Sequence, residues 1–303
     1  MVGRPKEMIW EATSPATNIL GGTAITKTVT IYFAGKKDGP KMDLRITLPA
    51  NAKKRVPIFL TPGFGGPGGR GNQTAQILIG RGYGLASVNL GMVEADKRDG
   101  YTNSIRKFFA PAGQIEPKPD EWGAIGAWAL AMSRAMDYLE TDPDIDAKKV
   151  CLNGVSRYGK VVMWAVAQDE RFAIIFSGES GCGGQTIVRR QFGETVGSIT
   201  GFAPYWFAGN FKNYANHVND LPVDWHELIA LMAPRPVYIA TAERDYWGDP
   251  HGSFLAAKAA EPVYQLFGES GLGVDEWPPV ETPIGDFIGY HNRKGTHGQN
   301  DYD

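Results

Sequence analysis

The chain has 303 residues, of which 31 are lysine or arginine and 33 are aspartate or glutamate, so its formal net charge at pH 7 is −2. This balance argues against a nucleic-acid-binding protein, which needs a basic face to track phosphates. No apolar run approaches the roughly 18 residues that a transmembrane helix requires. Residues 1–10 lack the apolar segment of a signal peptide. Cys151 and Cys182 show no zinc-binding spacing, and we expect unbridged, buried thiols.

The predicted elements begin with a hairpin and then alternate between strands and helices. Residues 26–33 and 42–48 alternate apolar and polar side chains around a turn at 36–40, which predicts antiparallel pairing. Continuous apolar runs, typical of strands buried on both faces of a parallel sheet, follow at 57–61, 85–90, 149–153, 174–177 and 236–242. Helical patterns lie at 74–81, 121–140, 159–170, 224–232 and 252–267. This order predicts an α/β fold, a three-layer sandwich with a mostly parallel sheet and an N-terminal antiparallel portion.

No interdomain linker interrupts this pattern, so we expect residues 1–303 to form a single domain. The segment 200–222 is rich in aromatic residues, glycine and asparagine, and is interpreted as an insertion over one end of the sheet. Its aromatic residues Trp206, Phe207 and Phe211 also prompt a different hypothesis, a non-catalytic carbohydrate-binding module. That hypothesis does not explain the candidate catalytic serine, histidine and acid that are described next.

The most informative motif is a Gly-x-Ser turn, in which Gly154 and Ser156 come between the strand at 149–153 and a helix. In a nucleophile elbow, such a turn exposes the serine hydroxyl and directs the next backbone N–H at a developing oxyanion. The motif departs from Gly-x-Ser-x-Gly, because Tyr158 holds the second position after the serine and the glycine comes at Gly159. The strand before and the helix after nevertheless favour Ser156 as a nucleophile over a structural serine.

A serine nucleophile needs a general base, and a histidine late in the chain is expected to supply it. The histidines are His217, His226, His251, His291 and His297. His226 lies in a helical pattern, where a satisfied structural histidine is expected. Residues 286–291 are interpreted as the last strand, with His291, also structural, at its end. His297 lies in the loop beyond, from which an imidazole can reach the elbow, and is the favoured base.

The acid that orients the base has two candidates. Glu179 follows the strand at 174–177, and Asp245 follows the strand at 236–242. Both lie just beyond the carboxyl end of a predicted strand, the edge at which such sheets place their sites. Position alone does not choose between them, and each could also be an ordinary solvated carboxylate.

Five segments carry a resemblance to a known family. They are Gly-Val-Ser-Arg-Tyr-Gly-Lys at 154–160, Glu-Ser-Gly-Cys-Gly-Gly at 179–184, Arg-Arg-Gln-Phe-Gly-Glu at 189–194, the stretch 226–236 and the tail 289–297. These segments resemble carbohydrate esterase family 15, the glucuronoyl esterases, and in particular its bacterial branch. The likeness runs from about residue 56 to the end. It implies an α/β-hydrolase fold and cleavage of the ester between a 4-O-methyl-glucuronic acid branch of xylan and a lignin alcohol, with no metal or organic cofactor.

The resemblance also implies catalytic roles. Ser156 matches the nucleophile and His297 the base. Glu179 matches the carboxylate that commonly completes the triad and is placed ahead of Asp245, which matches a second acidic position in some bacterial members. Arg157 matches an arginine whose guanidinium stabilises the oxyanion, beyond what backbone N–H groups supply.

Substrate-binding roles follow in the same way for Lys160, Glu194 and Trp247, which match positions that hold the sugar. The residues alone indicate only a surface lysine, a capping glutamate and a core tryptophan. The glycine-rich segment 61–70 is expected to supply part of the oxyanion hole and the rim of the site, and Phe64 to line the pocket.

The sequence also departs from the family pattern. Fungal members bridge a cysteine before the nucleophile to one near the histidine, whereas Val155 occupies the first position here. By comparison with the family pattern, we also expect residues upstream of Met1 that members usually carry to be missing from this sequence. The expected partner is glucuronoxylan or a lignin–carbohydrate ester, with no nucleic acid, membrane or obligate protein partner. Such a polymeric substrate implies a secreted or periplasmic protein. The alternative substrate is an acetyl or feruloyl ester of plant polysaccharide, cleaved by the same fold.

Overall fold

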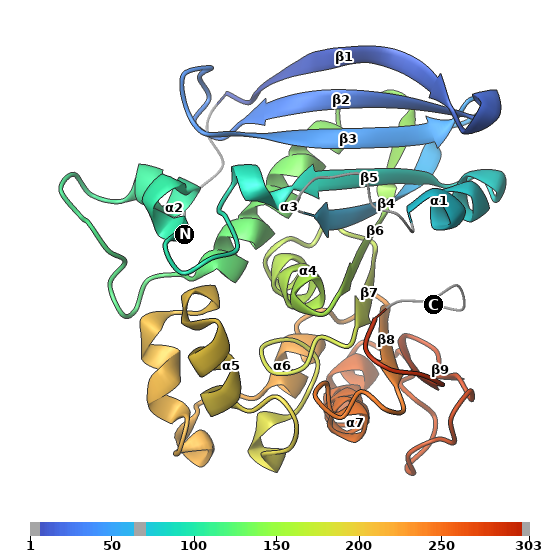
Figure 1. The fold of residues 1–303 in the computed structure, drawn as a ribbon. Helices are drawn as coiled ribbons and strands as arrows, with labels where there is room; N and C mark the ends of the chain where they lie inside the picture. The colour runs from blue at the N-terminus through green and yellow to red at the C-terminus, as the bar shows by residue number, and fades with distance from the viewer. Residues whose placement is uncertain (1–6, 64–70, 299–303) are drawn as a thin grey trace. The chain divides into compact units, whose positions relative to one another are not determined.

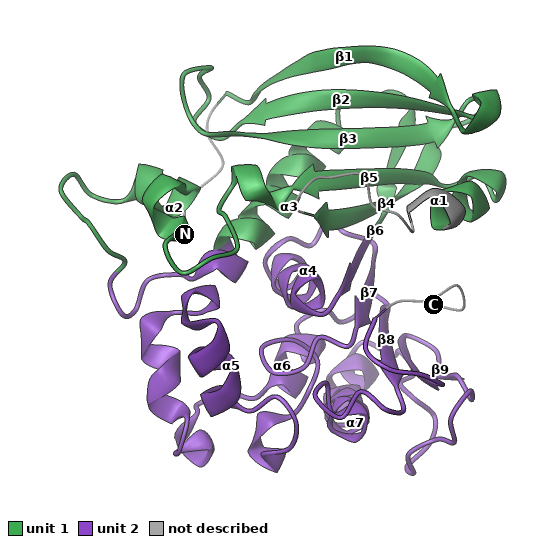
Figure 2. Ribbon diagram, in the orientation of Figure 1, with its two compact units in different colours: residues 1–117, 127–151 green, residues 118–126, 152–303 purple. Residues whose placement is uncertain are grey.

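The computed structural model describes residues 7–63 and 71–298 (Figure 1). Phe64 and most of the glycine-rich segment around it lie outside the described residues. The chain divides into two compact units, residues 1–117 with 127–151 and residues 118–126 with 152–303 (Figure 2). One strand, β6 (Ile145–Val155), contributes residues to both units. No helix in the part of the chain described is both long and apolar enough to cross a membrane.

The first unit contains an antiparallel portion and a parallel pair. Its elements are β1 (Ile9–Ile19), β2 (Ala24–Tyr32), β3 (Lys41–Pro49), β4 (Val56–Gly63), α1 (Gly71–Gly80), β5 (Gly84–Asn89), α2 (Ile105–Phe109) and most of α3 (Ala124–Leu139). The strand order is β1-β2-β3-β5-β4-β6. β1, β2, β3 and β5 pair antiparallel, whereas β4 and β5 are parallel. The predicted hairpin is confirmed as β2 and β3.

β1 was absent from the sequence prediction, and its burial explains why. Six of its eleven residues are exposed, in an irregular order, so the strand carries no clean alternation of apolar and polar side chains. Register shifts between Ala12 and Ser14 and between Ser14 and Thr17 also interrupt its pairing with β2. A strand at the edge of a sheet needs only one neighbour, and it can form without the pattern that identifies a buried strand.

The second unit contains the remaining strands and the helices that cover them. Its elements are the end of β6, α4 (Arg157–Gln168), β7 (Ile174–Gly178), α5 (Val196–Phe202), α6 (Trp225–Ala230), β8 (Val237–Ala242), α7 (Pro250–Leu266), β9 (Ile284–Gly285) and β10 (Ile288–Arg293). The strand order is β6-β7-β8-β10-β9, with β7, β8 and β10 parallel. α4 packs against β7, and α7 against β8 and β10 (Figure 1).

Three details of the chain refine the prediction. The last strand ends two residues later than expected, so His291 lies inside β10 rather than at its end. The predicted insertion holds the end of α5 and the short 3₁₀ helices Pro204–Trp206, Gly209–Tyr214 and Val218–Asp220. Cys151 and Cys182 form no disulfide and are buried, as expected, and burial raises the pKa of each thiol to about 12.

A buried ion pair holds the loop after β5 in the first unit. Arg106 donates from Nε and Nη2 to the two carboxylate oxygens of Glu94, at 2.7 and 2.5 Å. Both side chains are almost fully buried, and the indole N–H of Trp128 donates to the backbone carbonyl of Glu94. Removing one member of such a pair leaves a buried charge without its counterion, which is costly.

We therefore expect Glu94→Ala to lower the free energy of unfolding by about 3–5 kcal/mol. The exposed pair between Lys97 and Asp99 provides the control, because Lys97→Ala should cost less than about 1 kcal/mol. Urea denaturation of both variants checks this expectation. Equal losses in the two variants would contradict it.

Candidate active site

Ser156 lies in a strained turn between β6 and α4. Its backbone has φ 60° and ψ −131°, a conformation that residues with a Cβ rarely adopt and that usually marks a functional position. Its N–H donates to the carbonyl of Gly178, the last residue of β7, at 2.8 Å. The structure thus has the strand–turn–helix geometry of a nucleophile elbow at this serine.

Two glycines allow the elbow to form. A Cβ at Gly154 would lie 2.3 Å from the carbonyl oxygen of Tyr158, and a Cβ at Gly159 would lie 2.6 Å from Cβ of Ser180. The helix therefore approaches Ser180 too closely at position 159 for a side chain to fit there. This explains why the glycine stands there, whereas Gly-x-Ser-x-Gly would place it at Tyr158.

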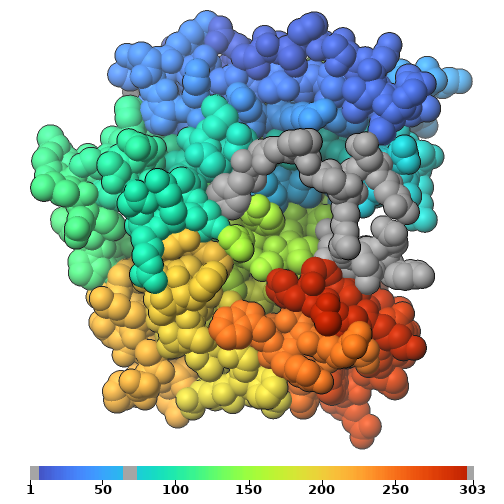
Figure 3. Space-filling model, viewed as in Figure 1, coloured from blue at the N-terminus to red at the C-terminus, as the bar shows by residue number. Residues whose placement is uncertain are grey.

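Four predicted site residues follow the carboxyl ends of neighbouring strands in the second unit. Ser156 follows β6, Glu179 follows β7, Asp245 follows β8 and His297 follows β10. Gly178 pairs with Ala240 and Arg293 with Ala242, so the parallel strands end at nearly the same level. The segments after β6, β8 and β10 reach the surface on the face shown in Figure 3, in yellow-green, orange and red. The shared sheet edge expected from sequence is present.

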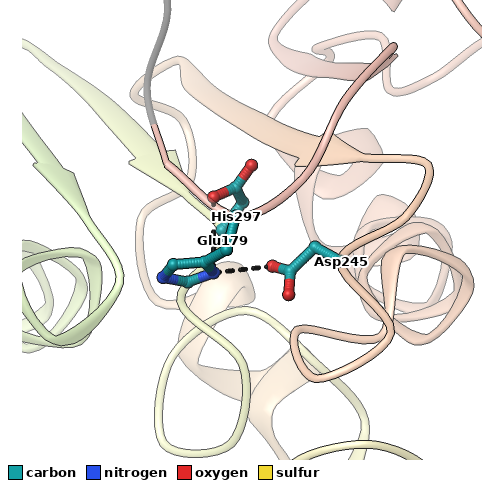
Figure 4. Close-up of side chains that lie close together, drawn as sticks. All are labelled: Glu179, Asp245 and His297. Atoms are coloured by element: carbon teal, nitrogen blue, oxygen red, sulfur yellow. Dashed lines mark hydrogen bonds and ion pairs between the residues drawn. The ribbon is translucent and has the colours of Figure 1, made fainter.

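The imidazole of His297 lies between two carboxylates (Figure 4). Its Nδ1 is 2.8 Å from Oδ2 of Asp245 and 3.4 Å from Oε2 of Glu179. Both acids are buried, whereas the imidazole is 42% exposed. The distances favour Asp245 as the hydrogen-bond partner, unlike the order that the family resemblance suggested.

Other partners occupy the two oxygens of Glu179. Arg293 donates from Nη2 to Oε1 at 2.7 Å, and the backbone N–H of Gly298 donates to Oε2 at 2.5 Å. Both contacts hold Glu179 against the loop that carries His297. Asp245, by contrast, receives the N–H of Gly248 on Oδ1 and leaves Oδ2 to the imidazole.

The environment shifts two pKa values in the site. The hydrogen bond to Asp245 raises the pKa of His297 above its usual value, and the charges of Asp245 and Glu179 add to this effect against the opposing effect of burial. Burial raises the pKa of Glu179, although Gly298 N–H and Arg293 favour its charged form. Perturbed titration in a cluster of this kind is typical of functional sites.

The same three residues are the one group in the described residues with the donor atoms and spacing for a metal ion. One donor atom from each of Glu179, Asp245 and His297 lies within 4.8 Å of the others. The Arg293 guanidinium on Glu179 brings a positive charge to this group, which opposes a second cation there. The arrangement therefore suits proton transfer better than metal binding.

A second polar group contains the three predicted sugar-binding residues. Lys160 is buried and donates from Nζ to the carbonyls of Ser180 and Cys182 and to Oε2 of Glu194, at 2.5, 2.8 and 2.5 Å. The indole N–H of Trp247 donates to the other oxygen of Glu194 at 3.0 Å. The side chain of Trp247 is nevertheless about half exposed.

These contacts overturn the interpretation of the three residues from sequence alone. Lys160 is not a surface residue, and Trp247 is not part of the core. Thr195, rather than Glu194, caps α5. Burial of a charged pair beneath an exposed indole is unusual for a structural role alone.

Arg157 begins α4 directly after the elbow, and its guanidinium lies 5.3 Å from the centre of the Trp206 ring. This cation–π contact comes from the inserted segment, whose Trp206 is buried. The insertion therefore contacts the first residue of α4 and holds the side chain that follows Ser156.

Two of the other candidate histidines, both expected to be structural, lie inside regular elements. His226 is in α6 and His291 in β10, so neither has the loop position of His297. His226 Nδ1 and His291 Nε2 are buried without a hydrogen-bond partner in the part of the chain described, so the expectation that His226 is fully satisfied is wrong.

A nucleophile elbow followed by a histidine and an acid on later strand ends defines the serine hydrolases of the α/β-hydrolase fold. The family model described as "Glucuronyl esterase, fungi" matches residues 30–268. The chain belongs to this family, the glucuronoyl esterases of carbohydrate esterase family 15, and is a carboxylic ester hydrolase with a mixed, mostly parallel sheet flanked by helices.

Individual relatives support this membership. A carbohydrate esterase from an unknown prokaryotic organism is 42% identical over 92% of this chain and 72% of its own length. The 4-O-methyl-glucuronoyl methylesterase of Hypocrea jecorina is 31% identical over 84% of this chain, which spans only 54% of that relative. The structure of a glucuronoyl esterase from Solibacter usitatus superposes with a TM-score of 0.93 at 43% identity, covering 100% of this chain and 85% of that one.

The elbow geometry generates a test of its own. Gly154→Ala places a Cβ 2.3 Å from a backbone oxygen, so the turn must open, and we expect loss of esterase activity together with a lower melting temperature. Gly201→Ala is the control, because its Cβ meets open space in a helix and should leave both quantities unchanged. An active and fully stable Gly154→Ala variant would contradict the close approach.

Proposed function

We propose that this protein hydrolyses 4-O-methyl-glucuronoyl esters that link glucuronoxylan to lignin alcohols, through an acyl-enzyme on Ser156. The hydrogen bond between His297 and Asp245, at the sheet edge where Ser156 forms its strained turn, is the observation that carries the proposal. The name of the Hypocrea jecorina relative, a 4-O-methyl-glucuronoyl methylesterase, supports the substrate class.

The proposed reaction uses one proton carrier. Asp245 accepts Nδ1–H of His297, which leaves Nε2 unprotonated and able to take the Ser156 proton. Ser156 then attacks the ester carbonyl, and Arg157 with backbone N–H groups stabilises the oxyanion. The protonated imidazole gives its proton to the departing alcohol. Water, deprotonated by the same imidazole, then releases glucuronate and frees the serine.

We assign the orienting role to Asp245 and a supporting role to Glu179. The shorter distance to Nδ1 favours Asp245. Glu179 adds a second negative charge near the imidazolium, which stabilises the protonated intermediate, while its oxygens remain bonded to Arg293 and Gly298. The two acids therefore act on the same imidazole by different means, one through a hydrogen bond and the other through its charge.

For the sugar, we propose that Trp247 packs its exposed indole against the pyranose ring and that Glu194 accepts from ring hydroxyls. Glu194 oxygens have acceptor capacity beyond the bonds to Lys160 and Trp247. Lys160 holds that carboxylate in place. To contact the sugar itself, Lys160 must exchange one of its three protein acceptors for a hydroxyl. Phe64, expected to line the pocket, lies outside the described residues.

The remaining expectations are proposals of the same kind. The reaction needs only protein side chains and water, so we propose no cofactor and no obligate protein partner. A polymeric plant substrate implies action outside the cytoplasm, in the periplasm or the medium. We also propose that 1–303 acts as a single catalytic domain, since β6 belongs to both compact units.

The nucleophile is tested with Ser156→Ala, which should lower kcat on benzyl glucuronate by a factor on the order of 10⁶ while leaving the circular dichroism spectrum unchanged. Ser270→Ala, an exposed serine in the same unit, should retain full activity. Activity retained by Ser156→Ala would refute the assignment. If the unmodified protein hydrolysed acetylated xylan or a feruloyl ester faster than benzyl glucuronate, the alternative substrate would replace the proposed one.

The acid is tested through the pH profile. His297 acts as base only when neutral, and its raised pKa places the acid limb of kcat/KM above the usual histidine value. Asp245→Asn removes the largest cause of that shift, so the limb should move to lower pH, and kcat at the plateau should fall by up to about 10⁴-fold.

Two variants complete this experiment. Glu179→Gln should reduce the plateau kcat less than Asp245→Asn does. Asp220→Asn, at an exposed aspartate near His217, should leave the profile unchanged. A larger loss in Glu179→Gln than in Asp245→Asn would reverse the assignment of the two acids.

A further inference from the structure

A buried arginine lies at the start of the loop that carries the proposed base. Arg293 is the last residue of β10, and it pairs with Ala242, the last residue of β8. Its carbonyl accepts the N–H of Glu243 at 2.9 Å, so its backbone is fixed to the sheet. Its side chain is only 4% exposed. A guanidinium so deeply buried must be compensated by nearby acceptors.

Those acceptors lie on both sides of His297. The Arg293 guanidinium donates to the carbonyls of Lys294 and Thr296, each at 3.0 Å, and to the carbonyl of Gly298. The residues before and after the imidazole are thus bonded to one rigid planar group. Arginine suits this task because its donors are fixed in a fork, whereas lysine presents a single point charge.

The fourth acceptor joins the loop to β7. Arg293 Nη2 donates to Glu179 Oε1 at 2.7 Å, and Glu179 Oε2 accepts the N–H of Gly298 at 2.5 Å. Glu179 and Arg293 together therefore clasp the loop from 294 to 298. Apart from this clasp, the backbone of that loop is held by the N–H of Arg244, which donates to Gly295 at 3.1 Å, and by the contact of Lys294 N–H with Glu281.

The charges explain why such a clasp suits the reaction. Glu179 and Asp245 bring two negative charges to one imidazole, and Arg293 brings one positive charge. With His297 included, these four side chains carry a net charge of −1 while the imidazole is neutral. Their net charge becomes zero when the imidazole is protonated. This difference favours the imidazolium that forms during catalysis, without two unbalanced carboxylates in a buried site.

We propose that Arg293 is a positioning residue, which acts through Glu179 to hold the His297 loop where the imidazole serves Ser156. This inference rests on the proposed function. Glu179 is consequently the anchor of the loop as well as a charge beside the base. The arginine need not touch the substrate. Its replacement should therefore lower kcat and leave substrate binding nearly unchanged.

Arg293→Met tests the proposal with benzyl glucuronate as substrate. Releasing both sides of the loop misplaces the imidazole, and we expect kcat to fall by about 10²-fold with KM changed by less than about threefold. Arg293→Lys should recover part of the loss. Arg244→Met is the matched control, because this neighbouring arginine is largely exposed and contributes only its backbone N–H to the loop.

A double-mutant cycle asks whether Arg293 acts through Glu179. If it does, Arg293→Met combined with Glu179→Gln should be no slower than the slower single variant. Strictly multiplicative losses would overturn the coupling, and a kcat equal to that of the unmodified protein in Arg293→Met would overturn the role itself. Should Arg293→Met fail to fold, Arg293→Lys decides, since unmodified kcat in a folded Lys variant also overturns the proposal.

The experiment separates this inference from the proposed function. Should the unmodified protein fail to hydrolyse benzyl glucuronate and its Ser156 fail to react with a fluorophosphonate probe, the proposed function is wrong. If the unmodified protein hydrolyses benzyl glucuronate and its Ser156 is labelled, but the Arg293 variants have the same kcat, then only the proposed role of Arg293 is wrong. The rate of probe labelling gives a second measure, because it also requires the base in place and should fall with kcat.

Discussion

Three backbone hydrogen bonds at the ends of neighbouring strands determine where the site can form. Ser156 N–H donates to Gly178, Glu179 N–H donates to Ala240, and Glu243 N–H donates to Arg293. They connect β6 to β7, β7 to β8, and β8 to β10 at the edge where each strand stops. A strained serine is tolerated only where its surroundings fix it, and these bonds give that fixation from the sheet itself. Ser156, the two acids and the loop that carries His297 are consequently attached to one rigid edge rather than to separate loops.

Charge then decides what each side chain at that edge can do. Two buried carboxylates beside one imidazole repel each other. Burial is the largest cause that raises the pKa of Glu179, and the charge of Asp245 raises it further. The nearby guanidinium of Arg293 favours the charged form of Glu179. Because Arg293 and Gly298 N–H engage Glu179, Asp245 has the oxygen directed at His297. The division of work between the acids follows from their other hydrogen bonds more than from their place in the sheet.

The sequence predicted best those features that depend on residues close together in the chain. The Gly-x-Ser turn, the runs of the central strands and the position of His297 beyond the last strand each depend on neighbours in sequence, and the structure has all of them. The choice between Glu179 and Asp245 depends on side-chain contacts more than 50 residues away along the chain, which no local pattern records. Arg293 was missed for the same reason, since an arginine in Asn-Arg-Lys resembles an ordinary surface residue. Lys160 became a candidate only through family resemblance, because its burial depends on carbonyls of the distant Ser180–Cys182 turn.

That same turn links recognition to catalysis. Glu179 anchors the histidine loop, and the next three residues, Ser180, Gly181 and Cys182, surround the Lys160–Glu194 pair. Gly181 has a positive φ, and a Cβ there would lie 2.4 Å from Glu194 Oε2, so the backbone and the carboxylate are in direct contact. Lys160 itself is only four residues after Ser156, on the first turn of α4. A shift of the turn at 179–182 would therefore move the proposed sugar ligands and the support of the base together. Close packing leaves few alternative arrangements in such a region, and a single piece of backbone accordingly fixes both the proposed sugar ligands and the anchor of the His297 loop.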